Sequence, residues 1–464
     1  MTFNEFINQQ LPHMKKLFIL LLFGMITWQQ GQAQTEVPSG PLDLATCVSI
    51  AIENNLTLKR SELNQLVTEA NLLESQGRRL PSLTTGASSG FRWGRSINPV
   101  TNLFETRRIG NVNLFGNTGA PIFQGMRINN SIGQAKSDLK SGEYTLEATR
   151  NDITLNVINL FIDVVFNREQ VKIAENQLNT TKEQLGRTQQ LVDAGSLPYS
   201  DLLDLQSQNA TNQLNVINAK NGLRLAKLAL AQALQIPFTE NFDVIEPVYE
   251  VSKEALAAGT PAEIFEVSVA LMPQIKAAEA NVKSAEYGVK IAKGGFLPTL
   301  DAGVSAFSNY VDQAFVRGTT EIIPFKTQVD NNFSQSGTLN FSIPLFTRFS
   351  NKSNLQRARV QQQLAEVSVT EAKNRLRQDI ETAYNSALSS ELSYQASLVR
   401  VKSLEETFRI AQQRFNLGAI NSVDFQVAQN NLFNAQADLL NAKYTYIFRI
   451  KVLDFYLGNP INLN

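Results

Sequence analysis

The sequence predicts a mainly α-helical, internally duplicated protein with long helical hairpins and two pairs of β-strands. Three observations indicate this fold class. Residues 345–459 contain no proline, and their apolar residues show a coiled-coil spacing. A stretch of the same design lies 223 residues upstream. Short segments of alternating polarity, typical of β-strands, lie beside prolines in both halves of the chain.

The second half is predicted to contain a long antiparallel helical hairpin. Its apolar residues recur at intervals of three and four, at Val401, Leu404, Phe408, Ala411 and Phe415, then at Ala428, Leu432, Ala435, Leu439, Ala442 and Tyr446. Gly418 lies between the two runs, where glycine readily takes the left-handed conformation that ends a helix. Ser422 is the expected N-cap of the return helix, with Asp424 in its first turn. A helix over 349–415 would be roughly 100 Å long.

The duplication is indicated by motifs that recur at a constant spacing. The turn that begins at Gly195 and leads to Asp201 recurs as Gly418 leading to Asp424, an offset of 223 residues. Internal repeats of this kind decide the architecture before any single element does. The predicted domains are, in order, a first repeat over 34–236, a linker over 237–262 and a second repeat over 263–464.

Residues 1–33 are predicted to be a signal peptide. Two lysines precede the apolar run 17–28, which is too short to span a bilayer, and small residues allow cleavage after Ala33. The polar residues before Met14 fit no signal peptide, so translation is expected to start at Met14. The mature chain is therefore expected to be exported.

Composition argues against several classes of function. The net charge is zero and no basic stripe is present, so nucleic acid is not an expected partner. The only histidine, His13, lies in the predicted leader. The mature chain then lacks a histidine for a catalytic triad or a histidine metal site, and it contains no phosphate-binding loop. We expect no enzyme and no cofactor.

The mature chain is expected to begin with a helix over 42–79, broken near Asn54 and Asn55 and ended by Pro81. Cys47 lies in this helix, after residues that resemble a lipoprotein box. It is too far from the apolar run for lipid attachment, and it falls on the apolar face of the helix. A buried structural cysteine is therefore expected.

Each repeat is predicted to hold one pair of strands, at about 82–123 and about 299–346. The apolar positions of each strand alternate with small or polar ones, as in 338–345. This pattern fits the wall of a membrane barrel, but it fits two solvent-exposed hairpins packed on helices equally well. Four strands are too few to close a barrel, since known membrane barrels have at least about eight. If the strands form a barrel, several chains must share it.

The remaining segments complete the two halves. A long helix is expected over 124–194 and a return helix over 200–236, and the linker is expected to form small structure around the helices. A second copy of the first helix is expected over 263–294, interrupted by Pro273. None of these helices is apolar over 18 residues, so none is expected to span a membrane.

This order of segments resembles the TolC family of outer-membrane efflux channels. The resemblance rests on Leu80-Pro81 and Leu297-Pro298 before the strand pairs, on the two Gly-x5-Asp turns, and on the closing segment 441–458. It covers essentially all of the mature chain. It implies a homotrimer in which each chain gives four strands to one twelve-stranded barrel and its helices to a tube across the periplasm. It also implies outer-membrane lipid, a periplasmic adaptor protein and an inner-membrane RND or ABC transporter as partners.

The resemblance also implies a gate at the tips of the hairpins. The family's aspartate ring maps to Asp424, its aromatic link to Phe415, and the acid of the other turn to Asp201. Gly195 and Gly418 mark the turns that would meet the adaptor. An acid that opens a helix is also favoured by the helix dipole alone, so capping is the simpler role for both aspartates.

This chain departs from the family pattern at two gate positions. Ile420 stands where the family has an arginine, so a salt bridge from that position to Asp201 cannot form. Val427 stands where a second aspartate is expected, so a cation-binding ring would be weaker. The closed state must then be held by other contacts.

Two other classes remain open from the sequence. A periplasmic adaptor has a helical hairpin, but it should show one hairpin between halves of small β-domains. A structural coiled-coil protein of the cell envelope should be soluble without detergent.

Overall fold

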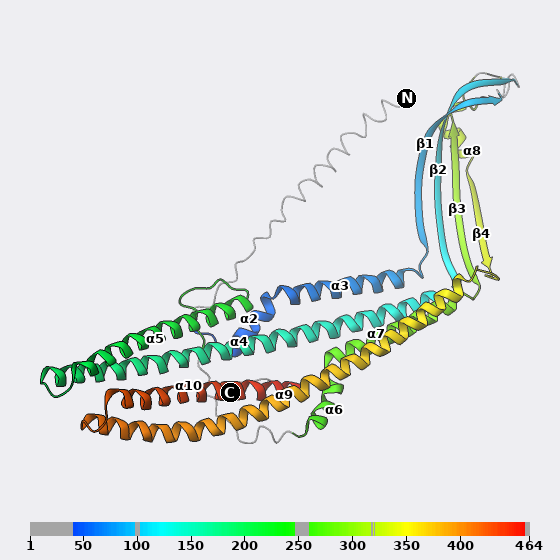
Figure 1. Cartoon of the computed structure of the whole chain (residues 1–464). Helices are drawn as coiled ribbons and strands as arrows, with labels where there is room; N and C mark the ends of the chain where they lie inside the picture. Colours follow the sequence, from blue (N-terminus) through cyan, green and yellow to red (C-terminus); the bar gives the residue numbers. More distant parts are fainter. Residues whose placement is uncertain (1–39, 98–102, 246–258, 317–318, 320, 460–464) are drawn as a thin grey trace.

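The computed structural model describes residues 40–97, 103–245, 259–316, 319 and 321–459. The predicted signal peptide and the start at Met14 lie outside the described residues. Long helices form an extended body, and one four-stranded sheet stands at one end of it (Figure 1). The tips of two helical hairpins lie at the opposite end (Figure 1).

The two hairpins have the same dimensions. Helices α4 (Arg127–Asp193) and α9 (Ser350–Asn416) each contain 67 residues, and α5 (Tyr199–Ala233) and α10 (Ser422–Tyr456) each contain 35. At about 1.5 Å per residue the longer helices are about 100 Å long. The duplication extends to single dihedral angles, because α4 and α9 both begin after a left-handed residue, Met126 and Phe349 respectively, 223 positions apart.

Glycine permits the two hairpin turns. Gly195 has a φ of 70° and Gly418 a φ of 71°, both in the left-handed region that other residues adopt only with strain. The prediction that Ser422 caps the return helix is wrong. Asn421 is the N-cap, and its side-chain oxygen accepts a hydrogen bond of 2.8 Å from the backbone N–H of Asp424. Ser422 is the first helical residue, which frees its hydroxyl for contacts with the other hairpin.

Four shorter helices accompany the hairpins: α2 (Leu44–Asn54), α3 (Leu56–Gly77), α6 (Pro261–Leu271) and α7 (Pro273–Gly294). The break near Asn54 and Asn55 is confirmed, since Asn55 ends α2 and caps α3 through its side chain. Pro273 separates α6 from α7 and occupies the first position of α7, where its missing N–H costs nothing.

The strands form one antiparallel sheet in the order β1-β2-β3-β4. Their bounds are Ser82–Ile97, Phe104–Gln124, Thr299–Val311 and Ser334–Ser342. The pairing of β2 with β3 joins the two repeats within one sheet. The expected strand over 338–345 ends earlier, at Ser342, because Pro344 has no N–H to donate to a ladder.

The sequence did not predict α8 (Phe325–Asn331), a short helix between β3 and β4. The Gln328 side chain holds it to β3, because it accepts from the N–H of Val311 at 3.0 Å and donates to the carbonyl of Val311 at 3.1 Å. A single side chain thus replaces a ladder pair at this point.

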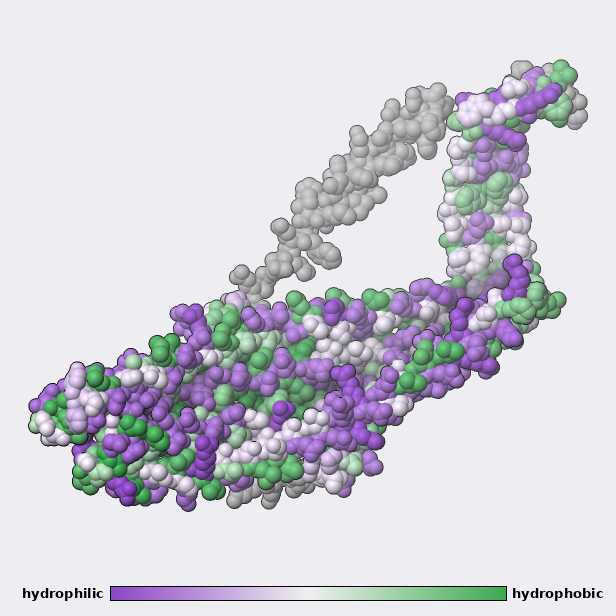
Figure 2. All heavy atoms as spheres, viewed as in Figure 1, coloured by the Kyte–Doolittle hydropathy of each residue, from purple (hydrophilic) through white to green (hydrophobic). Residues whose placement is uncertain are grey.

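The register of the sheet separates its two faces. Because side chains alternate along a strand, paired residues share a face. One face carries apolar and exposed side chains, among them Leu83, Phe91, Trp93, Val304, Leu339 and Phe341. The other face carries mostly small and polar residues, such as Ser88, Asn113, Asn117, Ser305, Ser336 and Asn340. Figure 2 shows mostly pale and green side chains along the middle of the sheet, whereas purple predominates over the helices.

The main apolar core lies where the two hairpins, α2 and residues 42 and 234–244 meet. Cys47 is fully buried in this core, as predicted, and burial raises the pKa of its thiol to about 12. The described part of the linker packs on the first hairpin. Val244 pairs with Leu42, and Asp243 forms ion pairs with Arg168 and, at 3.1 Å, with Lys227.

Candidate gate at the hairpin tips

The tips of the two hairpins lie side by side at the end of the helical body farthest from the sheet (Figure 1). Helix α10 of the second hairpin contacts α4 and α5 of the first, so the two coiled coils form a four-helix group. Three sets of contacts join them near the tips: a hydroxyl–carboxylate link, an aromatic cluster and a buried layer of polar side chains.

The first set, here called the tip link, consists of Ser422, Asp201 and Asp204. The Ser422 hydroxyl lies 3.3 Å from an Asp201 oxygen and 3.4 Å from an Asp204 oxygen. It can donate to one carboxylate at a time, and such bonds to charged acceptors are stronger than neutral ones. Ser422 is 1% exposed, so water competes little for its hydroxyl. The link connects the N-terminal ends of α5 and α10 and therefore the two hairpins.

The second set is an aromatic cluster to which both hairpins contribute side chains. Phe415 stacks on Phe425 with ring centroids 4.8 Å apart, and Phe425 also contacts the ring of Phe408. Leu205 of α5 packs against these rings and is fully buried. Ile420, at the position where the family pattern has an arginine, joins the same cluster. Apolar packing thus occupies the place of the polar links that this sequence lacks.

The third set is a layer of polar side chains between the hairpins, here called the polar layer. Thr181 of α4 is its centre, because its hydroxyl accepts from Asn212 of α5 at 2.8 Å and from Gln429 of α10 at 3.3 Å. All three residues are fully buried. Within the described part of the chain, five buried polar atoms near this layer have no hydrogen-bond partner; they belong to Gln184, Thr188, Asn209, Gln426 and Gln429. Each such atom costs about 1–3 kcal/mol.

The structure brings some of the predicted gate residues together and leaves others apart. Asp201 joins the tip link, and Phe415 is 8% exposed within the aromatic cluster. Asp424 lies exposed in the first turn of α10, on the N–H side of the helix where a negative charge is favoured. Gly195 and Gly418 are exposed in their turns.

Ser422 and Asp204 are tip residues that were not predicted from the sequence. Asp204 was detectable, because it lies three residues after Asp201 and therefore on the same face of α5. The sequence around Ser422 indicates only capping, a local role. Its contact spans 221 residues of sequence, so no local pattern could indicate it.

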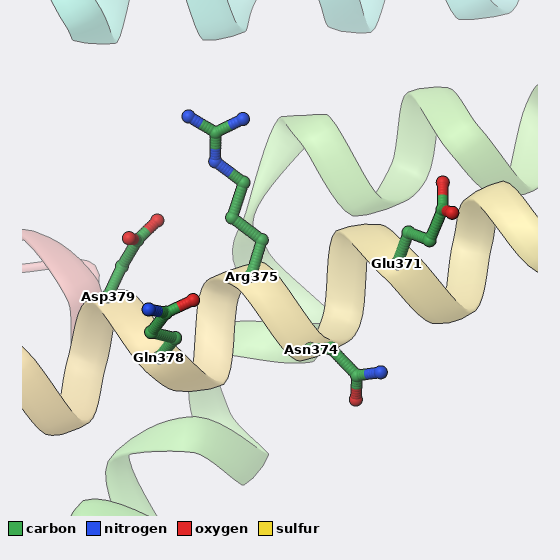
Figure 3. Close-up of a pocket in the computed structure, with 5 residues that line it drawn as sticks. All are labelled: Glu371, Asn374, Arg375, Gln378 and Asp379. Atoms are coloured by element: carbon green, nitrogen blue, oxygen red, sulfur yellow. The ribbon is translucent and has the colours of Figure 1, made fainter.

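A second polar feature lies far from the tips, on the middle of α9. Glu371, Arg375 and Asp379 point to one side of this helix and line an open pocket with Asn374 and Gln378 (Figure 3).

Burial raises the pKa of Tyr456 on α10 to about 12, and the charges of Asp379 and of Asp152 on α4 act in the same direction. The described residues contain no group of three or more His, Cys, Asp or Glu that could hold a metal ion.

Comparison with protein families decides the identity of the chain. The family described as "Outer membrane efflux protein" matches residues 47–234 and 268–459, one segment in each repeat. The chain belongs to this family. The outer membrane efflux proteins therefore include a member whose two hairpin tips are joined by the tip link, the aromatic cluster and the polar layer.

Curated relatives agree with the family. The outer membrane efflux protein BepC of Brucella suis is 21% identical over 398 residues, which cover 86% of this chain and 81% of BepC. The outer membrane protein TolC of Escherichia coli is 23% identical over 315 residues, covering 66% of this chain and 61% of TolC. These relatives are outer-membrane proteins, and this chain is an outer-membrane protein of the same family.

Solved structures show the same fold. VceC from Vibrio cholerae has a TM-score of 0.73 at 17% identity, covering 90% of this chain and 97% of VceC. The open state of MtrE from Neisseria gonorrhoeae has a TM-score of 0.73 at 18% identity, covering 93% of this chain and 95% of MtrE. None of the described helices is long and apolar enough to cross a membrane. The predicted combination of long helical hairpins with strands of an outer-membrane barrel is thus confirmed.

Proposed function

We propose that this chain is the outer-membrane channel of a tripartite efflux or type I secretion system. It conducts substrates passively from a periplasmic adaptor and an inner-membrane RND or ABC transporter to the exterior. The observation that carries the proposal is the sheet, whose apolar face is exposed and whose other face is small and polar. That division is typical of a barrel with lipid outside and water inside.

The assembly follows from the free edges of one chain. In the described part of the sheet, β1 and β4 are the two edge strands, and each offers unpaired backbone groups on one side. A lipid environment leaves no open edge, since unsatisfied backbone groups there cost several kcal/mol each. Hence β1 of one copy pairs with β4 of the next, and copies close into a ring.

The helical body of one chain also has two outer sides that can pack against neighbouring copies. In the described chain, α3 and α5 contact α4 on the side of the first repeat, whereas α9 contacts α7 and α10 on the side of the second. Both outer sides carry exposed apolar residues at helical spacing. On α3 and α5 these are Leu63, Leu66, Val67, Leu73, Leu214 and Ile217; on α9 they are Val360, Leu364, Val367, Leu392 and Val399. Such stripes pack as coiled-coil seams, here against the next copy.

The number of copies is three. Two chains would supply eight strands, the lower limit for a membrane barrel, whose interior is filled by side chains. Three chains supply twelve strands and leave an open lumen. The family resemblance implies the same homotrimer.

The hairpin tips form the periplasmic gate. The tip link and the aromatic cluster hold the two hairpins of each chain together, and Asp201 and Phe415 act within them. Asp424 is exposed in the first turn of α10 and faces the aperture. Three copies of it would form an acidic ring there. The exposed turns at Gly195 and Gly418 are the contact points for the adaptor.

Single-channel recording in a planar bilayer tests this proposal. The purified protein is expected to give small, discrete conductance steps, because the gate is closed most of the time. Replacing Ser422 by Ala removes the tip link, which is worth about 1 kcal/mol in each copy, so the open fraction should rise at least about fivefold. Asp424→Ala should also raise it, because the first turn of α10 at the aperture loses a charge that the helix dipole favours.

The matched control is Ser200→Ala, since Ser200 is exposed and adjacent to Asp201. This variant should conduct as the unaltered protein does. An unchanged open fraction in both Ser422→Ala and Asp424→Ala would exclude the gate, and the absence of any conductance would exclude the channel.

A further inference from the structure

The far end of the sheet carries arginines and aromatic rings on its apolar face. Trp93 is paired with Arg108, and Arg95 is paired with Thr106, so these residues lie on the face that also bears Leu83 and Phe91. The arginines are exposed, and Trp93 is 71% exposed. Purple and green side chains meet at this end of the sheet in Figure 2.

Each of the two arginines is held over an aromatic ring. The guanidinium carbon of Arg108 lies 4.6 Å from the ring centre of Phe91, and that of Arg95 lies 4.9 Å from the ring centre of Phe104. Cation–π contacts of this kind contribute about 0.5–1 kcal/mol at exposed sites. They fix the two guanidinium groups close to the sheet. Arg108 also forms an ion pair with Asp312, and each guanidinium has further N–H donors that can reach another acceptor.

The height of these residues matches the outer edge of the membrane. Leu83 and Trp93 are ten positions apart on β1, which is about 33 Å along a strand. At a tilt of about 45° this gives about 23 Å of height, close to the apolar band of about 25 Å in membrane barrels. Trp93 and Phe91 are therefore at the aromatic girdle, and Arg95 lies one pair beyond it, at the level of lipid headgroups.

We propose that Arg95 and Arg108 bind the phosphate groups of lipid molecules in the outer leaflet. Guanidinium groups bind phosphate through paired N–H donors, and the two residues present theirs on the lipid side of the wall. The acyl chains of the same lipid would lie along Phe91, Trp93 and the apolar positions below them. The proposal rests on the membrane barrel described above. It adds a lipid ligand to the channel function proposed there.

The nearest carboxylate leaves room for such a ligand. Asp312 lies 3.6 Å from Arg108, and its other oxygen accepts the backbone N–H of Gly110 at 2.7 Å. A side chain at position 110 would collide with Asp312, so glycine is what allows this carboxylate to lie flat on the sheet. Asp312 thereby orients Arg108 from one side. Arg95 adds the charge that makes the site cationic overall.

Native mass spectrometry of the detergent-purified channel tests the proposal. The channel is incubated with lipid A, which carries phosphates, or with the same lipid after enzymatic removal of its phosphates. We expect retention of phosphorylated lipid at least tenfold above the phosphate-free form. The Arg95→Gln/Arg108→Gln double variant should lose this preference.

Arg92→Gln is the matched control, because Arg92 lies on the same strand but faces the other side of the sheet. It should retain lipid as the unaltered channel does. Equal retention of both lipids by the unaltered channel would overturn the proposal without any variant, and so would an unaffected double variant. Displacement by millimolar inorganic phosphate would show a general anion site instead of a lipid site. Conductance of each preparation reports separately whether the channel itself has formed.

Discussion

At the scale of single residues, the tip link shows how a site is rebuilt when the family's residues are absent. Ile420 and Phe415 cannot form the salt bridge and hydroxyl link that the family resemblance implies, and both enter an aromatic cluster instead. Ser422 supplies a hydroxyl from another position and reaches two carboxylates on the facing hairpin. The polar connection is thus kept between the hairpins, although the residues that make it are different.

Cys47 gives a test of the buried core at the same scale. Burial raises the pKa of its thiol from 9.0 to about 12, because the thiolate is poorly solvated there. The folded state favours the thiol, so this group lowers the stability of the fold only above about pH 9. We expect no maleimide labelling of the folded protein at pH 8 and complete labelling in denaturant. Labelling of the folded protein, or a lipid attached to Cys47, would contradict the structure of this core.

At the scale of elements, the helices and strands were predictable because their signals are local. Heptad spacing, the glycine turns and the prolines at helix–strand junctions lie in short windows of sequence. The long hairpin helices α4 and α9 follow from these signals, close to the expected bounds. Helix α8 was not predictable, since it is stabilised by hydrogen bonds between its own Gln328 side chain and the backbone of Val311 on β3, which are not local in sequence. The cap at Asn421 was missed because Asn and Ser are both good caps and stand side by side.

The polar layer leads to a prediction at this scale. Gln429 is fully buried, donates one bond of 3.3 Å to Thr181, and leaves its own side-chain oxygen without a partner in the described chain. Methionine has a similar volume and no group that needs a hydrogen bond. Gln429→Met should therefore stabilise the packing of the two hairpins by about 1 kcal/mol and lower the open fraction about fivefold.

Single-channel recording checks this expectation, with Gln436→Met as the control. Gln436 lies two turns farther along α10 and is half-buried, so its replacement should leave gating unchanged. A higher open fraction in Gln429→Met would mean that the hydrogen bond from Gln429 to Thr181 outweighs the cost of the unpartnered Gln429 oxygen.

At the scale of the whole molecule, one chain has two opposite sides, and each side forms an interface with a neighbouring copy. Its sheet has two free edges, β1 and β4, and its helical body has two apolar sides, one along α3 and α5 and the other along α9. In both pairs, one surface belongs to the first repeat and the other to the second repeat. Ring closure satisfies them at once, which explains why four strands and unusually long helices occur together in one chain.

The most direct test of this account is cross-linking of the two sheet edges between copies. Cysteine is introduced at Thr85 on β1 and, in turn, at Gln335 or Leu339 on β4; all three side chains are exposed on the apolar face. Cys47 is buried and does not compete. After treatment with a short bifunctional maleimide, the account predicts covalent dimers and trimers and nothing larger for at least one pair. A protein that stays monomeric with both pairs, or a ladder that continues beyond three chains, would contradict it.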